Sequence, residues 1–298
     1  MNFLTRREFA LLVASSLLAR RAFPQADTSS ILMRAIPKTG ERIPAVGLGT
    51  ASTFDRDSES ARRSASEVVH ALLDGGGRLI DTASTYGDAE VVLGKVMAAE
   101  HLRERIFIAT KLEEPDEAEL QRSLSRLRAA KLDLLQLHNV RDTRQSLARF
   151  REWKAQGVCR YVGITSTYHS DFGAVEAVLG REKPDFVQID YSLDERTVEA
   201  RILPLAADVG AAVLTALPFG RGRLFRAVRG KAIPDWAQRF ADSWAQFFLK
   251  YLLGDPRVTA VIPGTTSAAH MTDNLGAMRG PLPDAEQRKR MVAFIEKL

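Results

Sequence analysis

An acid and a phenol stand five residues apart in residues 79–87, which read LIDTASTYG. The stretch begins with the apolar Leu79 and Ile80, as a buried strand would, and Asp81 follows where that strand would end. Tyr86 comes on the next loop, beside a glycine. A carboxylate and a phenol above the end of a sheet can handle a proton together, provided that a cation and a second polar group join them.

The two missing partners follow at the ends of the next two apolar runs. Residues 106–111 (IFIATK) end in Lys111, and residues 134–138 (LLQLH) end in His138. An unperturbed phenol has a pKa of about 10 and is a weak acid at neutral pH. A lysine cation favours the phenolate form, and Asp81 would hold that lysine charged and oriented. Tyr86 could then protonate a carbonyl oxygen that His138 orients, with a nicotinamide cofactor as the source of hydride.

Eight short apolar runs, separated by helical stretches, must position these side chains. Apolar and polar residues do not alternate along these runs, as they would in a strand with one face in water. Continuous apolar runs are typical of parallel strands that are covered on both faces. The runs occupy residues 45–50, 79–83, 106–111, 134–138, 161–165, 186–191, 211–217 and 258–263. Helices are predicted at 58–73, 89–100, 116–130, 143–156, 171–182, 198–209, 236–253, 268–278 and 284–298.

Repeated β/α units in 298 residues predict a (β/α)8 TIM barrel. An open doubly wound sheet is the alternative, and it is disfavoured because no G-x-G-x-x-G turn follows the first strand. Residues 31–44 are expected to form an N-terminal hairpin, turning at Thr39–Gly40, that covers the bottom of the barrel. Residues 27–298 are therefore expected to form one barrel domain. In such a barrel the strands' carboxyl ends share one face, where Asp81, Lys111 and His138 would meet.

Charge and cysteine content exclude several classes of function. The net charge is +5, and residues 1–26 contribute +3 of it, so the remainder is too weakly basic to predict nucleic-acid binding. Cys159 is the single cysteine, which excludes an intramolecular disulfide and a cysteine metal cluster. We predict no metal site and, for the folded domain, a monomer.

The first 26 residues resemble a twin-arginine signal peptide. Arg6 and Arg7 precede a short apolar run, and Arg20 and Arg21 follow it. The run is far shorter than the roughly 20 residues of a membrane-spanning helix, so no stable anchor is expected. The alternative is a frayed amphipathic helix. The signal predicts a periplasmic protein, exported folded by the twin-arginine machinery and cut after Ala26.

The motifs of residues 31–290 resemble the aldo-keto reductase family. They read GLGT at 47–50, IDTASTYGDAE at 80–90, ATK at 109–111, LDLLQLHN at 132–139 and VQIDYS at 187–192. The resemblance implies a TIM barrel that reduces an aldehyde or ketone with NADPH, Tyr86 being the general acid. The family's catalytic tetrad corresponds to Asp81, Tyr86, Lys111 and His138.

The resemblance also implies a cofactor site, with departures from the family pattern. Thr165–Ser166 replaces a Ser-Asn pair, Ala216 replaces a ring-stacking tyrosine, and Gly264 and His270 replace a lysine and an arginine that face the 2′-phosphate. NADP is therefore expected, with NAD as the alternative. The cofactor positions that we predict are Gly49, Thr50, Asp81, Thr165, Ser166, Gln188, Leu217, Phe219, Gly220, Pro263, Gly264, Thr265, His270, Asp273 and Asn274.

Substrate contacts are expected from Tyr86 and His138, and from the aromatic residues Phe54 and Trp236. The basic loop 218–236 is either a flap over the cofactor or a solvated loop. Two other functions remain open from the sequence. One is a nicotinamide-binding regulatory or partner-binding module with little catalysis. The other is a lyase that uses Lys111 as a Schiff base.

Overall fold

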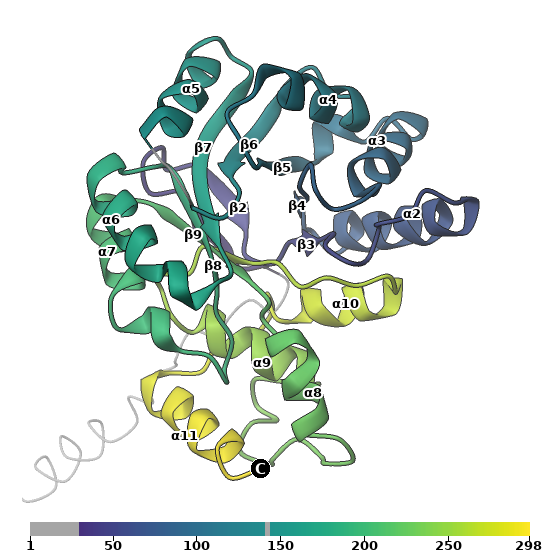
Figure 1. Cartoon of the computed structure of the whole chain (residues 1–298). Coiled ribbons are helices and arrows are strands. Elements are labelled where there is room, and N and C mark those ends of the chain that lie inside the picture. Colours follow the sequence, from purple (N-terminus) through teal and green to yellow (C-terminus); the bar gives the residue numbers. More distant parts are fainter. Residues whose placement is uncertain (1–29, 141–143) are drawn as a thin grey trace, which may run out of the picture.

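The eight parallel strands of the main sheet carry the fold (Figure 1). The computed structural model describes residues 30–140 and 144–298. The strands neighbour one another in chain order, from β3 at one edge to β10 at the other. They are β3 (Leu48–Gly49), β4 (Leu79–Asp81), β5 (Phe107–Leu112), β6 (Leu132–Leu137), β7 (Cys159–Ser166), β8 (Phe186–Asp190), β9 (Ala212–Ala216) and β10 (Ala260–Val261).

The first and last strands meet, so the sheet closes into a (β/α)8 barrel. Val46 bridges Val261 in parallel, and Gly49 bridges Gly264. The Gly47 amide donates to the Val261 carbonyl at 2.9 Å. A Cβ on Gly49 would lie 2.9 Å from the Ile262 carbonyl oxygen, so the seam needs glycine there. Closure confirms the predicted barrel and excludes the open doubly wound sheet.

The predicted N-terminal hairpin is confirmed. Strand β1 (Met33–Ala35) pairs antiparallel with β2 (Arg42–Pro44), and Gly40 turns the chain with a φ of +74°. Ile36 and Ile43 are fully buried and join the apolar cluster inside the barrel, together with Leu79 at the amino end of β4. The hairpin therefore seals the end of the barrel opposite to the strands' carboxyl ends.

Helices cover the outside of the barrel. In α2 (Glu59–Asp74) the Ser58 side chain caps the amino end, and Val68, Val69 and Leu72 are buried. Burying each such side chain stabilises the fold by about 1.5–3 kcal/mol. The other helices of the described chain are α3 (Ala89–Ala99), α4 (Glu117–Leu127), α5 (Arg144–Ala155), α6 (Phe172–Glu182), α7 (Ile202–Val209), α8 (Arg223–Ala227), α9 (Trp244–Leu253), α10 (Ala268–Gly276) and α11 (Ala285–Ile295).

Two predicted helices begin too early. The helix expected over 198–209 begins at Ile202 as α7, and a 3₁₀ turn at Thr197–Glu199 precedes it. The expected helix over 236–253 is wrong in its first half, because α9 begins only at Trp244. Ser243 has the extended backbone of a helix cap (φ −140°, ψ 162°), and its hydroxyl accepts the Gln246 amide at 3.1 Å. The preceding residues form turns in which Trp236 packs as a loop residue. A short helix, α8, instead lies inside the basic loop 218–236.

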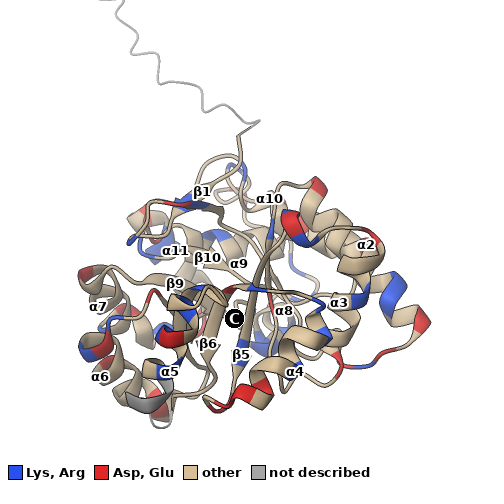
Figure 2. Ribbon diagram, turned by 90° about the horizontal axis from the view of Figure 1, so that it is seen from above, with Lys and Arg blue, Asp and Glu red and all other residues tan. Residues whose placement is uncertain are grey.

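Charged side chains of both signs are mixed over the outer helices, as Figure 2 shows for α2, α3 and α4. Within residues 30–140 and 144–298, no helix has the length and apolar character needed to cross a membrane. The predicted signal peptide, residues 1–26, lies outside the described residues.

Candidate active site

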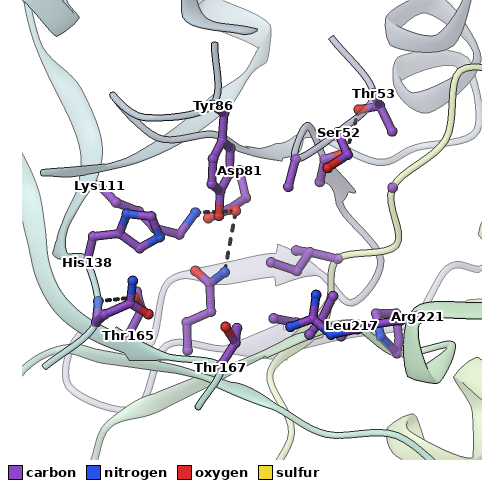
Figure 3. Close-up of a pocket in the computed structure, with 18 of the residues that line it drawn as sticks. Ser52, Thr53, Asp81, Tyr86, Lys111, His138, Thr165, Thr167, Leu217 and Arg221 are labelled. Atoms are coloured by element: carbon purple, nitrogen blue, oxygen red, sulfur yellow. Dashed lines mark hydrogen bonds and ion pairs between the residues drawn. The ribbon is translucent and has the colours of Figure 1, made fainter. Parts of the chain in front are cut away.

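A cavity of about 660 Å³ opens at the carboxyl ends of the barrel strands. Asp81, Tyr86, Lys111 and His138 all line it, and Figure 3 shows these four side chains converging. They come from the end of β4, its following loop, the end of β5 and the residue after β6. The structure thus brings together the whole tetrad that the sequence predicted.

Asp81 and Lys111 form a buried ion pair. The Lys111 ammonium lies 2.6 Å from Asp81 Oδ2 and also donates to the Thr82 carbonyl at 2.8 Å. Burial by itself lowers the pKa of Lys111, but the Asp81 carboxylate and the Tyr86 phenol oppose it and hold the pKa above its ordinary value. Lys111 is therefore a permanent cation at neutral pH.

Two glutamine amides hold the other side of the carboxylate. Gln136 Nε2 lies 3.4 Å from Asp81 Oδ1, and Gln188 Nε2 lies 3.4 Å from Oδ2. The amides also bond each other, Gln136 Nε2 donating to Gln188 Oε1 at 3.0 Å. Burial raises the pKa of Asp81, and Lys111 and these amides counter that rise. The network fixes the position of the carboxylate, and thereby that of the lysine.

Tyr86 lies between the lysine and the histidine. The Lys111 ammonium is 4.8 Å from the centroid of the Tyr86 ring. The Tyr86 and His138 rings meet edge to face, with centroids 5.6 Å apart. The backbone amide of His138 donates to the Leu112 carbonyl at 2.8 Å, which ties this residue to the end of β5. A small molecule in the cavity would thus meet a phenol, a cation and an imidazole together.

Glu113 is a cavity residue that the sequence analysis missed. Its Oε1 lies 2.5 Å from His138 Nδ1, and Thr85 Oγ1 lies 3.3 Å from the same nitrogen. The spacing could have indicated it. Glu113 stands two residues after Lys111, and residues two apart in an extended chain point to the same side. Asn139, Thr167, Tyr168 and Arg221 also line the cavity without having been predicted as site residues.

Some of the residues predicted for the nicotinamide end of the cofactor line the cavity, and others do not. Gly49, Thr165 and Gln188 line the cavity. Thr165 Oγ1 accepts the Asn139 amide at 3.2 Å. Ser166 does not line it, because its hydroxyl turns to Asp171 at 3.0 Å.

Thr50 also lies outside the cavity lining, and its hydroxyl donates to the Asp81 carbonyl at 3.1 Å. Leu217 and Phe219 line the cavity, and Leu217 has a positive φ of 53°. Gly220 lies just behind them, where a Cβ would come within 2.5 Å of Asp194 Oδ1. This close approach explains the glycine.

The residues predicted for the far end of the cofactor gather around the start of α10. Gly264 lines the cavity, whereas the Pro263 carbonyl is occupied by the barrel seam, accepting the Gly49 amide at 3.0 Å. Thr265 Oγ1 accepts the Ser267 amide at 3.1 Å, and Ser267 caps α10.

Three more of these predicted residues lie on α10 itself, outside the cavity lining. His270 is exposed, and its amide donates to the capping hydroxyl at 3.3 Å. Asp273 Oδ1 accepts the Gln246 amide at 2.9 Å, and Asn274 is buried. Any contact from these three residues to a ligand would therefore be made beyond the cavity.

The two aromatic residues predicted for the substrate lie elsewhere. Phe54 is 1% exposed and belongs to the apolar core. Trp236 makes tilted or edge-to-face contacts with Phe240, Phe247 and Phe294, and the Arg290 guanidinium lies 4.4 Å from the centroid of its ring. Neither residue lines the cavity. The aromatic lining comes from Tyr86, Tyr168 and Phe219 instead.

A closed barrel with an acid, a phenol, an ammonium and an imidazole around one cavity has the groups that proton transfer to a bound small molecule requires. Residues 45–295 match the Aldo/keto reductase family. The chain therefore belongs to that family and is an oxidoreductase, as the sequence motifs predicted.

Characterised relatives and solved structures are similar over most of the chain. "Methylglyoxal reductase YeaE" of Escherichia coli is 28% identical over 82% of this chain and 88% of its own. "6-dehydroglucose reductase" of Novosphingobium aromaticivorans is 31% identical over 72% of this chain and 80% of its own. An aldo/keto reductase from Klebsiella pneumoniae, solved with NADP and acetate, is 25% identical with a TM-score of 0.74, covering 88% of this chain and 95% of its own.

Proposed function

We propose that this protein reduces an aldehyde or ketone to an alcohol with NADPH, and that Tyr86 is the general acid. One observation carries the proposal. A lysine that is held charged by Asp81 at 2.6 Å lies 4.8 Å from the centroid of the Tyr86 ring, in a cavity that His138 also lines. A cation beside a phenol eases the loss of the phenolic proton, which is what a general acid needs.

The polar groups of the cavity fit a nicotinamide nucleotide. Thr165 and Gln188 offer a hydroxyl and an amide on the cavity wall, suited to a carboxamide. Gly264 lines the cavity without a side chain, so its backbone is open to a ligand. The amino end of α10 favours a phosphate nearby. When bound, the nicotinamide supplies the hydride, and NADP in the Klebsiella pneumoniae relative supports this choice of cofactor.

The chain's own residues supply the proton and the orientation. Tyr86 gives its proton to the carbonyl oxygen as that oxygen gains electrons. Lys111 stabilises the phenolate that remains, because its own pKa is held high beside Asp81. His138 hydrogen-bonds the same oxygen and fixes its direction. A general acid in this position contributes about 10²–10⁴-fold to the rate.

The substrate class follows from the site and the relatives. The cavity of about 660 Å³ must hold both the nicotinamide end of the cofactor and the substrate, so a small carbonyl compound fits best. The names of two relatives, a methylglyoxal reductase and a 6-dehydroglucose reductase, point to 2-oxoaldehydes and oxidised sugars as first candidates.

A panel of aldehydes and ketones tests the proposal. Each compound is mixed with the protein and NADPH or NADH, and the absorbance of the reduced nicotinamide is followed. Tyr86→Phe should lower turnover by about 10²-fold or more while leaving NADPH binding, measured by fluorescence titration, unchanged. Tyr168→Phe is the matched control, because Tyr168 lines the same cavity but is 56% exposed. Tight NADPH binding with no turnover of any compound would favour the regulatory module instead.

We further propose that the protein acts as a periplasmic monomer after twin-arginine export. The paired arginines Arg6 and Arg7 before a short apolar run support this location. Replacing both by lysine should leave the protein in the cytoplasm, as read by cell fractionation. Unchanged arrival in the periplasm would refute the export route. Sedimentation of the mature protein tests the monomer.

A further inference from the structure

Glu113 and His138 form a second acid–base pair at the same cavity. Glu113 Oε1 lies 2.5 Å from His138 Nδ1, and both side chains are partly buried, at 26% and 13% exposure. Thr85 Oγ1 lies 3.5 Å from that carboxylate oxygen and 3.3 Å from that nitrogen. Three polar groups therefore meet at one edge of the imidazole ring.

The backbone of Glu113 is held in place by Glu119. The Glu113 amide donates to Glu119 Oε1 at 3.2 Å, and the Ser84 hydroxyl donates to the same oxygen at 2.6 Å. Glu119 thus joins the loop that carries Tyr86 to the residue that faces His138. The backbone of His138 is fixed independently through the Leu112 carbonyl. The backbones on both sides of the short contact between Glu113 and His138 are therefore fixed by separate hydrogen bonds.

This contact decides which nitrogen of the ring carries a proton. An ionised carboxylate only accepts hydrogen bonds, so Nδ1 must be the donor in this contact. A neutral imidazole would then have its lone pair on Nε2, and it could not donate to a carbonyl oxygen there. With Nδ1 engaged by Glu113, only an imidazolium lets His138 donate through Nε2. A carboxylate at 2.5 Å stabilises that charged form.

We propose that Glu113 is a positioning residue that keeps His138 protonated on both nitrogens, so that Nε2 donates a hydrogen bond to the carbonyl oxygen that Tyr86 protonates. The inference rests on the proposed reduction and adds a residue to it. Tyr86 then lies between two ion pairs, Asp81–Lys111 and Glu113–His138. The proton transferred to the product comes from Tyr86, and His138 keeps its own.

The charges around His138 are compatible with an imidazolium. Glu113 and Tyr86 both contact the His138 ring, and the Lys111 ammonium lies against the Tyr86 ring. Asp81 balances Lys111 at 2.6 Å, so that cation is already paired. Glu113, at 2.5 Å from Nδ1, supplies a negative charge that balances an imidazolium at His138.

The test is Glu113→Gln, in the full mature protein, with Glu114→Gln as the matched control. Glutamine can still accept the Nδ1–H bond through Oε1, so only the charge is lost. Glu114 follows Glu113 directly and is exposed. The measurements are kcat and KM against pH, with NADPH and the best carbonyl substrate from the panel.

We expect Glu113→Gln to lower kcat about 10- to 100-fold at neutral pH, by analogy with the carboxylates that orient metal-binding histidines. The loss of activity on raising the pH should begin at a lower pH than in the wild type. Glu114→Gln should match the wild type in both. An unchanged pH profile in Glu113→Gln, whatever happens to kcat, would overturn the proposal, because a merely structural role does not move the profile.

A nitrogen NMR spectrum of the wild-type protein gives a second test that needs no variant. Both ring nitrogens of His138 should carry a proton at neutral pH, and a neutral ring would overturn the inference. This readout needs no turnover. A wild-type protein that reduces nothing therefore refutes the proposed function, whereas an active wild type with a neutral His138 refutes only the role of Glu113.

Discussion

Replacing Lys111 by methionine tests how the centre of the site is held together. Lys111 and Asp81 are 1% and 2% exposed, and Lys111→Met leaves the Asp81 carboxylate buried without its cation. Removing one partner of a buried ion pair costs about 3–5 kcal/mol. The amides of Gln136 and Gln188 still face the carboxylate, at 3.4 Å, so we expect the lower end of that range.

The loss of stability should depend on pH, and the sign follows from Asp81. Burial raises the pKa of this carboxyl, and the variant lacks the ammonium that opposes the rise. A raised pKa in the folded state means that stability is present at acid pH and is lost as the pH rises through that pKa. The deficit of Lys111→Met should therefore be largest at neutral pH and shrink toward acid pH.

Urea unfolding, followed by tryptophan fluorescence at neutral and acid pH, measures the deficit. The double variant Asp81→Asn with Lys111→Met carries no charge at this position and should recover most of the lost stability at neutral pH. This variant also keeps the test decisive where Lys111→Met alone does not fold. An equal deficit at both pH values, or a double variant no more stable than Lys111→Met, would refute the reasoning.

Two further predictions concern the packing of α3 against its neighbours. Glu90 is 1% exposed and accepts the Thr110 hydroxyl at 2.7 Å, and burial raises its pKa. Glu90→Gln keeps an acceptor and removes the charge, so it should stabilise the protein by about 1 kcal/mol at neutral pH and not below the ordinary pKa of glutamate, as urea midpoints will reveal. In Gly94→Ala the new Cβ would lie 2.0 Å from the Arg126 carbonyl oxygen, so thermal unfolding should show a loss of about 1–3 kcal/mol. The control Gly173→Ala, also in a helix and with nothing within 4 Å, should gain about 0.5–1 kcal/mol; a comparable loss at both glycines would contradict this account.

The barrel and the tetrad could be predicted because both follow from short sequence segments. Each apolar run has the length of a strand, and Asp81 and Lys111 fall at the strands' carboxyl ends. Parallel strands bring those ends to one face whatever the loops do. The chemistry at that face therefore follows from residue type and strand position alone.

The cofactor side was harder, because it depends on which way neighbouring side chains point. Thr165 and Ser166 are adjacent in β7, so their side chains leave opposite faces of the strand, and only Thr165 lines the cavity. Glu113 was missed because its role depends on a contact with His138, which follows a different strand, β6. Contacts between distant residues leave no periodic pattern in the sequence.

The early helix prediction over 236–253 failed for a different reason. Trp236 and Phe240 have helical spacing, but they pack against Phe247 from a turn. The true start carried a signal of its own. Ser243 stands three residues before Gln246, which is the pattern of a capped helix end.

The seam of the barrel has a consequence for how the chain is made. The β3 region pairs with the β10 region, so a partner for Val46 does not exist until Val261 has been synthesised. Docking of the N-terminal hairpin also depends on late residues, because the Leu32 amide donates to the Met278 carbonyl at 2.8 Å. Pairing between such distant segments is slow and leaves a sheet edge open meanwhile. A nascent chain of this protein therefore exposes an unpaired strand edge for almost the whole of its translation. Until Val261 has been made, the fold itself cannot protect that edge from pairing with another chain.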